Sequence, residues 1–152
     1  MKAHRFPEKI VAAVRDAKII GIRAGTKPHR IIGIWTVVVE NRVFVRSWGL
    51  KERGWYSTFL EDPVGVILVD GREIPVSAVF TRSERLKTLV DKAYAEKFNT
   101  PGSRHFVQGF VRSKKRRDTT TELVMRKKGK GERVKGNKVS SSKSQVSGSR
   151  SR

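Results

Sequence analysis

The chain contains no cysteine, which excludes disulfide bonds, thiolate metal sites and cysteine nucleophiles. This absence fits a reducing compartment, so we expect a cytoplasmic protein, although some secreted proteins also lack cysteine. No apolar run approaches the roughly 20 residues that a membrane-spanning helix needs. The apolar stretch at residues 10–14 is too short for a secretion signal and is followed by charged residues. We therefore expect no membrane partner.

Histidine is scarce, and its three positions, 4, 29 and 105, are scattered. They show neither a His-x-x-x-His spacing nor a carboxylate spacing that would hold a metal ion, so no metal is predicted. The carboxylates form no acid–base pair, because Asp70 occupies a turn while Asp91 and Glu96 are expected on the exposed face of a helix. The Gly-x-Ser-x-Gly motif is absent. Hydrolytic chemistry is not expected.

Acidic residues are few: 14 Asp and Glu stand against 34 Lys and Arg, a formal net charge of +20. Such a charge predicts salt-sensitive attraction to polyanions. Residues 127–152 hold nine of the basic residues, one Glu and only three apolar residues. This composition cannot bury enough surface to offset its ordering entropy, so we expect a disordered basic tail. Residues 1–126 keep a net charge of +12 and are expected to form one folded domain.

The first half of the chain is predicted to begin with a helix and to continue as strands. Pro7 and Glu8 favour a helix start, and apolar residues then recur at helical spacing as far as Ala17. The segment 31–40, IIGIWTVVVE, is apolar on both faces, as expected of a central strand that is covered on both sides. Other strands are predicted at 18–23 and 43–48, with a hairpin turn at Asn41–Arg42.

The second half has a clearer hairpin and a clearer helix. The hairpin turns at Asp70–Gly71, and Pro75 marks an edge or rim because it has no N–H for a ladder. The helix begins at the capping box Thr81–Glu84, and its apolar stripe runs to Phe98. The predicted class is α+β: an antiparallel meander that would close into a barrel, with an N-terminal helix and one long amphipathic helix. Strands are expected at 64–69, 73–80 and 119–125.

The cationic segment Arg46 to Tyr56 is the candidate binding site, followed by a short helix up to Leu60. Arg46, Lys51 and Arg53 would point at one anion, and nearby glycines would let the backbone approach a phosphate. Ser47 would add a hydroxyl, and the aromatic residues of the segment would form a wall for a planar ring. The alternative is a solvated basic loop whose aromatic residues plug the end of the barrel.

A second cationic cluster, Arg112 to Arg117, precedes the last strand. It would either clamp a nucleic-acid backbone through Lys114, Lys115, Arg116 and Arg117 or form a solvated loop. We favour the loop, because runs of like charge are usually solvated. Together with the tail, the cluster would still form an electrostatic footprint for nonspecific nucleic-acid binding.

Several of these segments together resemble the flavin-binding split β-barrel of the pyridoxamine-phosphate-oxidase-like superfamily. They are the run 30–36, the hairpin to 43–47 and the segment 51–56. More narrowly, the chain from Pro28 to about Val124 is similar to an uncharacterised bacterial family catalogued as domain of unknown function 2255. The features are Arg-Ser after the second strand of that hairpin, Gly-Trp-Tyr a few residues on, and the helix with Asp91, Ala93, Tyr94 and Lys97.

The resemblance implies a six-stranded split barrel, commonly a homodimer, that holds FMN or a deazaflavin between subunits and transfers hydride to or from an unknown small molecule. Such proteins need few catalytic side chains, because the cofactor supplies the chemistry. A non-enzymatic basic protein that binds nucleic acid or other polyanions is the alternative. The positions that match the superfamily's cofactor contacts are Arg30, Arg46, Ser47, Lys51 and Arg53 for the phosphate, with Ile34, Trp35 and Thr36 along the ring.

Overall fold

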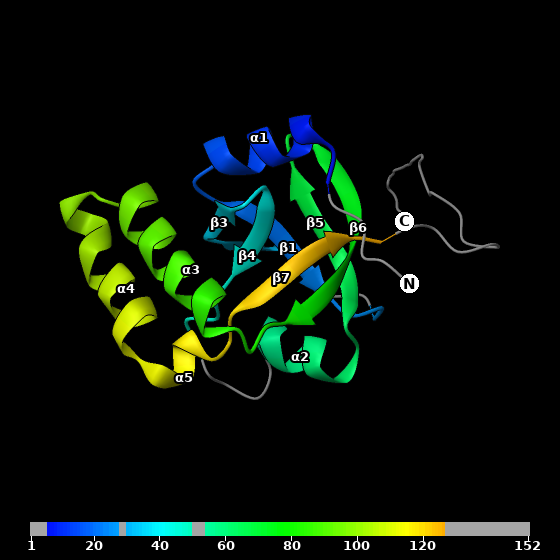
Figure 1. Ribbon diagram of the computed structural model, residues 1–152. Coiled ribbons are helices and arrows are strands. Elements are labelled where there is room, and N and C mark those ends of the chain that lie inside the picture. Colours follow the sequence, from blue (N-terminus) through cyan, green and yellow to red (C-terminus); the bar gives the residue numbers. More distant parts are fainter. Residues whose placement is uncertain (1–5, 28–29, 50–53, 127–152) are drawn as a thin grey trace.

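The computed structural model describes residues 6–27, 30–49 and 54–126. Within these ranges, seven strands form one antiparallel sheet in the order β2-β1-β5-β6-β7-β4-β3. Its two edge strands, β2 (Ile32–Ile34) and β3 (Thr36–Val39), are separated in the chain by Trp35 alone. The sheet therefore curls into a nearly closed barrel whose edges meet at Trp35 (Figure 1). This confirms the α+β class and the antiparallel split barrel, although the sheet has seven described strands where the resemblance implied six.

The last strand of the described chain, β7 (Thr121–Met125), closes the sheet. It pairs with β6 on one side and with β4 on the other, so it joins two hairpins that are far apart in the sequence. The remaining strands are β1 (Ile20–Ala24), β4 (Arg42–Val45), β5 (Val64–Val69) and β6 (Arg72–Phe80). The helices are α1 (Glu8–Asp16), α2 (Trp55–Glu61), α3 (Glu84–Lys97), α4 (Pro101–Arg112) and α5 (Lys114–Arg117).

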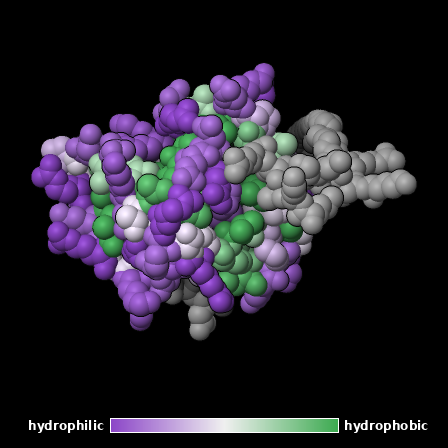
Figure 2. Space-filling model, in the orientation of Figure 1, coloured by the Kyte–Doolittle hydropathy of each residue, from purple (hydrophilic) through white to green (hydrophobic). Residues whose placement is uncertain are grey.

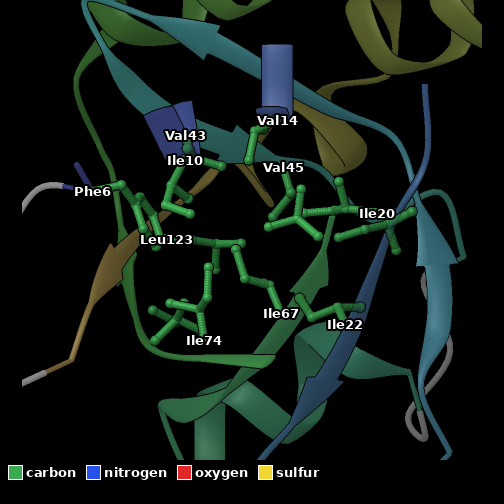
Figure 3. Close-up of a cluster of buried hydrophobic side chains, with 14 of the residues drawn as sticks. Phe6, Ile10, Val14, Ile20, Ile22, Val43, Val45, Ile67, Ile74 and Leu123 are labelled. Atoms are coloured by element: carbon green, nitrogen blue, oxygen red, sulfur yellow. The ribbon is translucent and has the colours of Figure 1, made fainter. Parts of the chain in front are cut away.

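The barrel interior is filled by aliphatic side chains, and α1 covers one end of it. In Figure 3, Ile10 and Val14 of α1 lie beside Val45, Ile67 and Leu123 from three different strands. Strand residues alternate between the two faces of a sheet, which brings alternate residues such as Ile20, Ile22 and Ala24 of β1 into this core. The predicted N-terminal helix is confirmed, and its apolar stripe closes the barrel.

A second core lies outside the barrel, under α3 and α4, which run side by side in Figure 1. β4 is buried on both faces: Val43 and Val45 face the interior, while Phe44 packs under the helices. Tyr94 of α3 and Phe110 of α4 stack on each other, with ring centroids 4.8 Å apart. This helical layer places α4 beside the seam of the barrel, which is the place where the edge strands β2 and β3 meet at Trp35.

The prediction of one central strand at 31–40 is wrong, because Trp35 interrupts it and the two pieces occupy opposite edges of the sheet. Trp35 leaves the strand because its ring stacks on Phe98 at 4.2 Å and its carbonyl accepts a hydrogen bond from the Tyr94 hydroxyl (2.8 Å). The second piece is apolar on both faces because α3 covers its outer side. The turn lies at Glu40–Asn41, where both φ angles are positive, one residue before the predicted turn.

The hairpin at Asp70–Gly71 is confirmed, with positive φ at both residues. Pro75 lies at the rim, since the β6–β7 ladder begins at Val76. The long helix is confirmed with its cap, in which the Ser83 hydroxyl accepts from the Leu86 amide (3.2 Å). Helices α4 and α5 were not predicted. Within the described ranges, no helix combines the length and apolarity that crossing a bilayer requires.

Thr36 supplies a test of packing in the barrel interior. It is fully buried, and its hydroxyl has no hydrogen-bond partner among the described residues. An unpaired buried hydroxyl is costly, so we expect Thr36→Val to raise the free energy of unfolding by about 1 kcal/mol. Denaturant unfolding measures the change.

Thr121 is the matched control, because it is equally buried but its hydroxyl donates to the Thr119 carbonyl (2.8 Å). Thr121→Val should lower the free energy of unfolding by about 1 kcal/mol. A loss of stability in Thr36→Val would show that the Thr36 hydroxyl has a partner.

Candidate functional site

A pocket of about 550 Å³ opens at the seam of the barrel. Its walls are β2 with Trp35, the chain that follows β4, the start of α2 and the inner face of α4. Five of the twelve described lining residues are aromatic, and the only charged lining residue among those the structure describes is Arg46. The aromatic residues that line it are Trp35, Trp48, Trp55, Phe106 and Phe110.

Trp48 is held rigidly as a wall of this pocket. Its ring packs against the backbone of Gly109, where an added Cβ would lie only 2.3 Å from ring carbon Cζ3. The guanidinium carbon of Arg116 lies 4.1 Å from a Trp48 ring centroid, and Arg116 Nε donates to the Trp48 carbonyl (2.7 Å). A cation this close to an aromatic ring is attracted by the ring quadrupole. Trp48 therefore borders the pocket and does not fill it.

Arg46 does not present its charge to the pocket. Its side chain is fully buried, and the guanidinium donates to Asp91 (2.6 Å). The prediction had Arg46 point at an anion beside Lys51 and Arg53, which both lie outside the described residues. Asp91 was expected on an exposed helix face, and the structure corrects this, since the carboxylate faces Arg46. The other acceptors of the guanidinium are Thr120 Oγ1 (2.7 Å) and the carbonyls of Lys87 (2.8 Å) and Phe110 (2.9 Å).

The surroundings of Arg46 act on its pKa in opposite directions. Burial lowers the pKa of the guanidinium, and the ion pair with Asp91 opposes that shift. Arg117 contacts the same carboxylate through Nε (3.1 Å), so Asp91 serves two guanidinium groups. The resulting network stabilises the wall of the pocket and keeps the guanidinium of Arg46, the one charged group among the described lining residues, inside the protein.

Hydroxyl groups hold the backbone that forms the pocket walls. The Tyr94 hydroxyl accepts from the Arg46 amide (3.1 Å) and donates to the Trp35 carbonyl (2.8 Å), so it ties together two walls. The Ser47 amide donates to Thr119 Oγ1 (2.9 Å). Ser47 lines the pocket as predicted, although its hydroxyl donates to a carbonyl within its own turn.

Only two of the three predicted ring contacts line the pocket. They are Ile34 and Trp35, whereas Thr36 is fully buried and is not part of the lining. Arg30 lines a second, smaller pocket of about 230 Å³. The structure therefore separates Arg30 from Arg46, which the prediction placed on one phosphate.

The cluster Arg112 to Arg117, which was expected to form a loop, comprises the last residue of α4, Ser113 and helix α5. Of the four cations of α5, only Lys115 has no hydrogen bond or ion pair among the described residues. The cluster is thus largely used inside the protein, where it joins α5 to α3 and to the pocket wall. The other three contact Asp118 (Lys114, 2.9 Å), Trp48 (Arg116) and Asp91 and Glu84 (Arg117, 3.1 and 2.7 Å).

Phe106 and Phe110 were missed because α4 was not predicted. The apolar stripe of the preceding helix ends at Phe98, and the sequence pattern predicts no further helix after it. Thr100 and Pro101 carried a second signal, since Thr favours the N-cap and Pro the first helical position. In the structure the Thr100 hydroxyl accepts from the Ser103 amide (3.3 Å), and Pro101 begins the helix.

Replacing the buried guanidinium should destabilise the whole fold. Arg46→Met leaves two buried carbonyls without their donors, so we expect the free energy of unfolding to fall by about 3 kcal/mol. The control is Arg85→Met, because Arg85 makes an exposed ion pair with Glu40 (2.6 Å). That pair should contribute about 1 kcal/mol or less. Equal losses in chemical denaturation would refute the central role of Arg46.

The chain contains two tyrosines, which makes its alkaline titration informative. Burial raises the pKa of Tyr94 well above its ordinary value. An unfolded tyrosine ionises at about pH 10. The stability that comes from burying the neutral Tyr94 hydroxyl is therefore fully present below that pH and is lost as the pH rises beyond it. Near-ultraviolet absorbance should show Tyr56 ionising first and Tyr94 only with unfolding. Ionisation of both groups in a chain that keeps its near-ultraviolet circular dichroism would contradict this.

The fold and the sequence were compared with known proteins. The family model described as "Uncharacterized protein conserved in bacteria (DUF2255)" matches residues 9–123. No curated protein matches the chain. The crystal structure of conserved hypothetical protein Rv2991 from Mycobacterium tuberculosis is similar, with a TM-score of 0.50, 14% identity and 82% of each chain covered. At that identity the similarity concerns the fold alone. Because the family model spans most of its length, this chain belongs to the uncharacterised bacterial family DUF2255.

Proposed function

We propose that the aromatic pocket binds the ring system of a flavin, either FMN or a deazaflavin, and that the protein is an oxidoreductase acting on a small molecule. The observation that carries this proposal is the composition of the pocket. Three indoles and two phenyl rings surround a space of about 550 Å³ in which no described charged group is directed. Pockets of about 300–1,000 Å³ are typical of small-molecule sites, and an apolar aromatic lining favours a flat ligand.

The edge strand β2 adds polar groups to this apolar space. It pairs with β1 on one side only, so the backbone N–H and C=O groups on its other side are free of the sheet. Residues 32–34 line the pocket. A heterocycle with donors and acceptors along one edge, such as the pyrimidine end of a flavin, would complement such a strand. The residues present therefore fit the cofactor.

A bound flavin would supply the hydride transfer, and the protein would supply orientation and water exclusion. Trp35 and Trp48 would form the walls along the ring, and Tyr94 would keep those walls at a constant separation through its two hydrogen bonds. Among the described lining residues there is no carboxylate or histidine. This division of labour agrees with the lack of an acid–base pair in the sequence.

Polyanion binding is the second candidate function, and the outer face of α4 supports it. Arg104 and Arg112 are exposed there, Lys115 follows on α5, and α4 contains no acidic residue. Figure 2 shows mostly hydrophilic residues over the side on which α3 and α4 lie. Nucleic acid bound in this way would be lost steeply with salt. A homodimer, which the superfamily resemblance implies, would bring the surface of a second copy to either candidate binding site.

The flavin proposal predicts that the purified chain is yellow or binds added FMN with quenching of flavin fluorescence. Phe106→Ala removes a partly exposed ring of the pocket, so it should weaken FMN binding about 3- to 10-fold. Val79→Ala removes a similarly exposed apolar side chain on β6 and should leave binding unchanged.

Native mass and the absorbance of nucleic acid, measured on the same sample in moderate salt, separate the candidates. A flavin spectrum supports the first. Co-purified nucleic acid without any response to FMN or a deazaflavin at high micromolar concentration would favour the second and overturn the first.

A further inference from the structure

Among the described residues that line the aromatic pocket there is no free cation, although FMN and deazaflavin cofactors carry phosphate groups. The nearest candidate by sequence, Arg46, donates to four protein acceptors and is fully buried. An anion brought into this pocket would lose its hydration without gaining an opposite charge from any described residue. The described lining of the aromatic pocket therefore offers no partner for the charged end of such a ligand.

The second pocket begins where the aromatic pocket ends. Ile32 of β2 and Trp55 of α2 line both of them. The ring of Trp55 also contacts that of Phe59, with centroids 5.9 Å apart. A ligand that occupied both pockets would pass the side chains of Ile32 and Trp55.

The second pocket has the charge that the first one lacks. Arg23 and Arg30 line it, and Thr58 adds a hydroxyl. Arg30 is exposed and has no hydrogen bond or ion pair among the described residues. Arg23 is about one-third exposed, and its only described ion pair, with Glu73, is as long as 4.0 Å. Both guanidinium groups therefore keep donors available for an anion.

Nearby acidic groups do not cancel this charge. Asp62, which follows α2, accepts hydrogen bonds from the Thr26 amide (2.9 Å) and the Thr26 hydroxyl (2.8 Å). Glu73 contacts Arg23 only at 4.0 Å, and its side chain is more than half exposed. No carboxylate is among the described residues that line the second pocket. The lining thus carries two positive charges and no negative one.

We propose that Arg23 and Arg30 bind the phosphate, or another anionic group, of a ligand whose aromatic ring occupies the first pocket. The ligand class is a planar aromatic compound with a tethered anion, and the inference rests on the proposed function for its ring site. Guanidinium groups suit this role because their planar fork pairs with two oxygens of a phosphate. Arg23 and Thr58 become specificity residues that sequence reasoning did not single out.

The test compares FMN with riboflavin, which has the same ring and tether but no phosphate, on the full chain. We expect FMN to bind at least about 10-fold more tightly, as charged hydrogen bonds permit. The double variant Arg23→Gln, Arg30→Gln should reduce the affinity for FMN to that for riboflavin and leave riboflavin binding unchanged. Lys92→Ala, which removes one exposed charge from α3, should alter neither affinity.

The outcomes distinguish this inference from the proposed function. Equal binding of FMN and riboflavin, or an FMN preference that survives in the double variant, would overturn the anion subsite and leave the ring site standing. If neither flavin binds, the flavin proposal fails, and naphthyl phosphate against naphthol then tests the subsite alone. Tighter binding of naphthyl phosphate that disappears in the double variant supports the anion subsite. Equal binding of naphthyl phosphate and naphthol overturns it.

Discussion

The ion pair between Arg46 and Asp91 is the interaction on which the geometry of the site depends. A fully buried guanidinium is tolerated only where acceptors replace its hydration, and here four acceptors do so. They come from α3, from α4 and from the chain before β7, each at least 41 residues away in the sequence. The same side chain therefore joins the barrel to its helical layer and places α4 beside the seam.

The distribution of charge gives the strongly basic composition a more specific meaning. Much of the described charge is used in ion pairs, such as Arg42 with Glu122 (2.7 Å) and Arg117 with Glu84 (2.7 Å). The described lining of the aromatic pocket presents no free charge, while the pocket next to it is lined by Arg23 and Arg30. A ligand would thus meet an apolar aromatic region and, next to it, a cationic region.

The elements that the sequence predicted well are those with local signals. The Asp70–Gly71 hairpin has turn residues that favour positive φ, and the Thr81–Glu84 capping box defines the start of α3. The prediction of a single strand at 31–40 failed because the break at Trp35 has a distant cause, the stacking of Trp35 on Phe98. Apolar residues on both faces of a strand report burial, and burial under a helix looks the same in sequence as burial in the centre of a sheet.

The sequence by itself determined the α+β class and the absence of cysteine chemistry. It also placed Ser47, Trp48 and Trp55 near one another, because they are close in the chain. Only the tertiary structure decided that Arg46 turns inward, that α4 supplies two rings of the pocket, and that Arg30 lies in the neighbouring pocket with Arg23. The reason is physical: the direction of a charged side chain depends on which acceptors the fold brings to it, and those acceptors belong to distant segments.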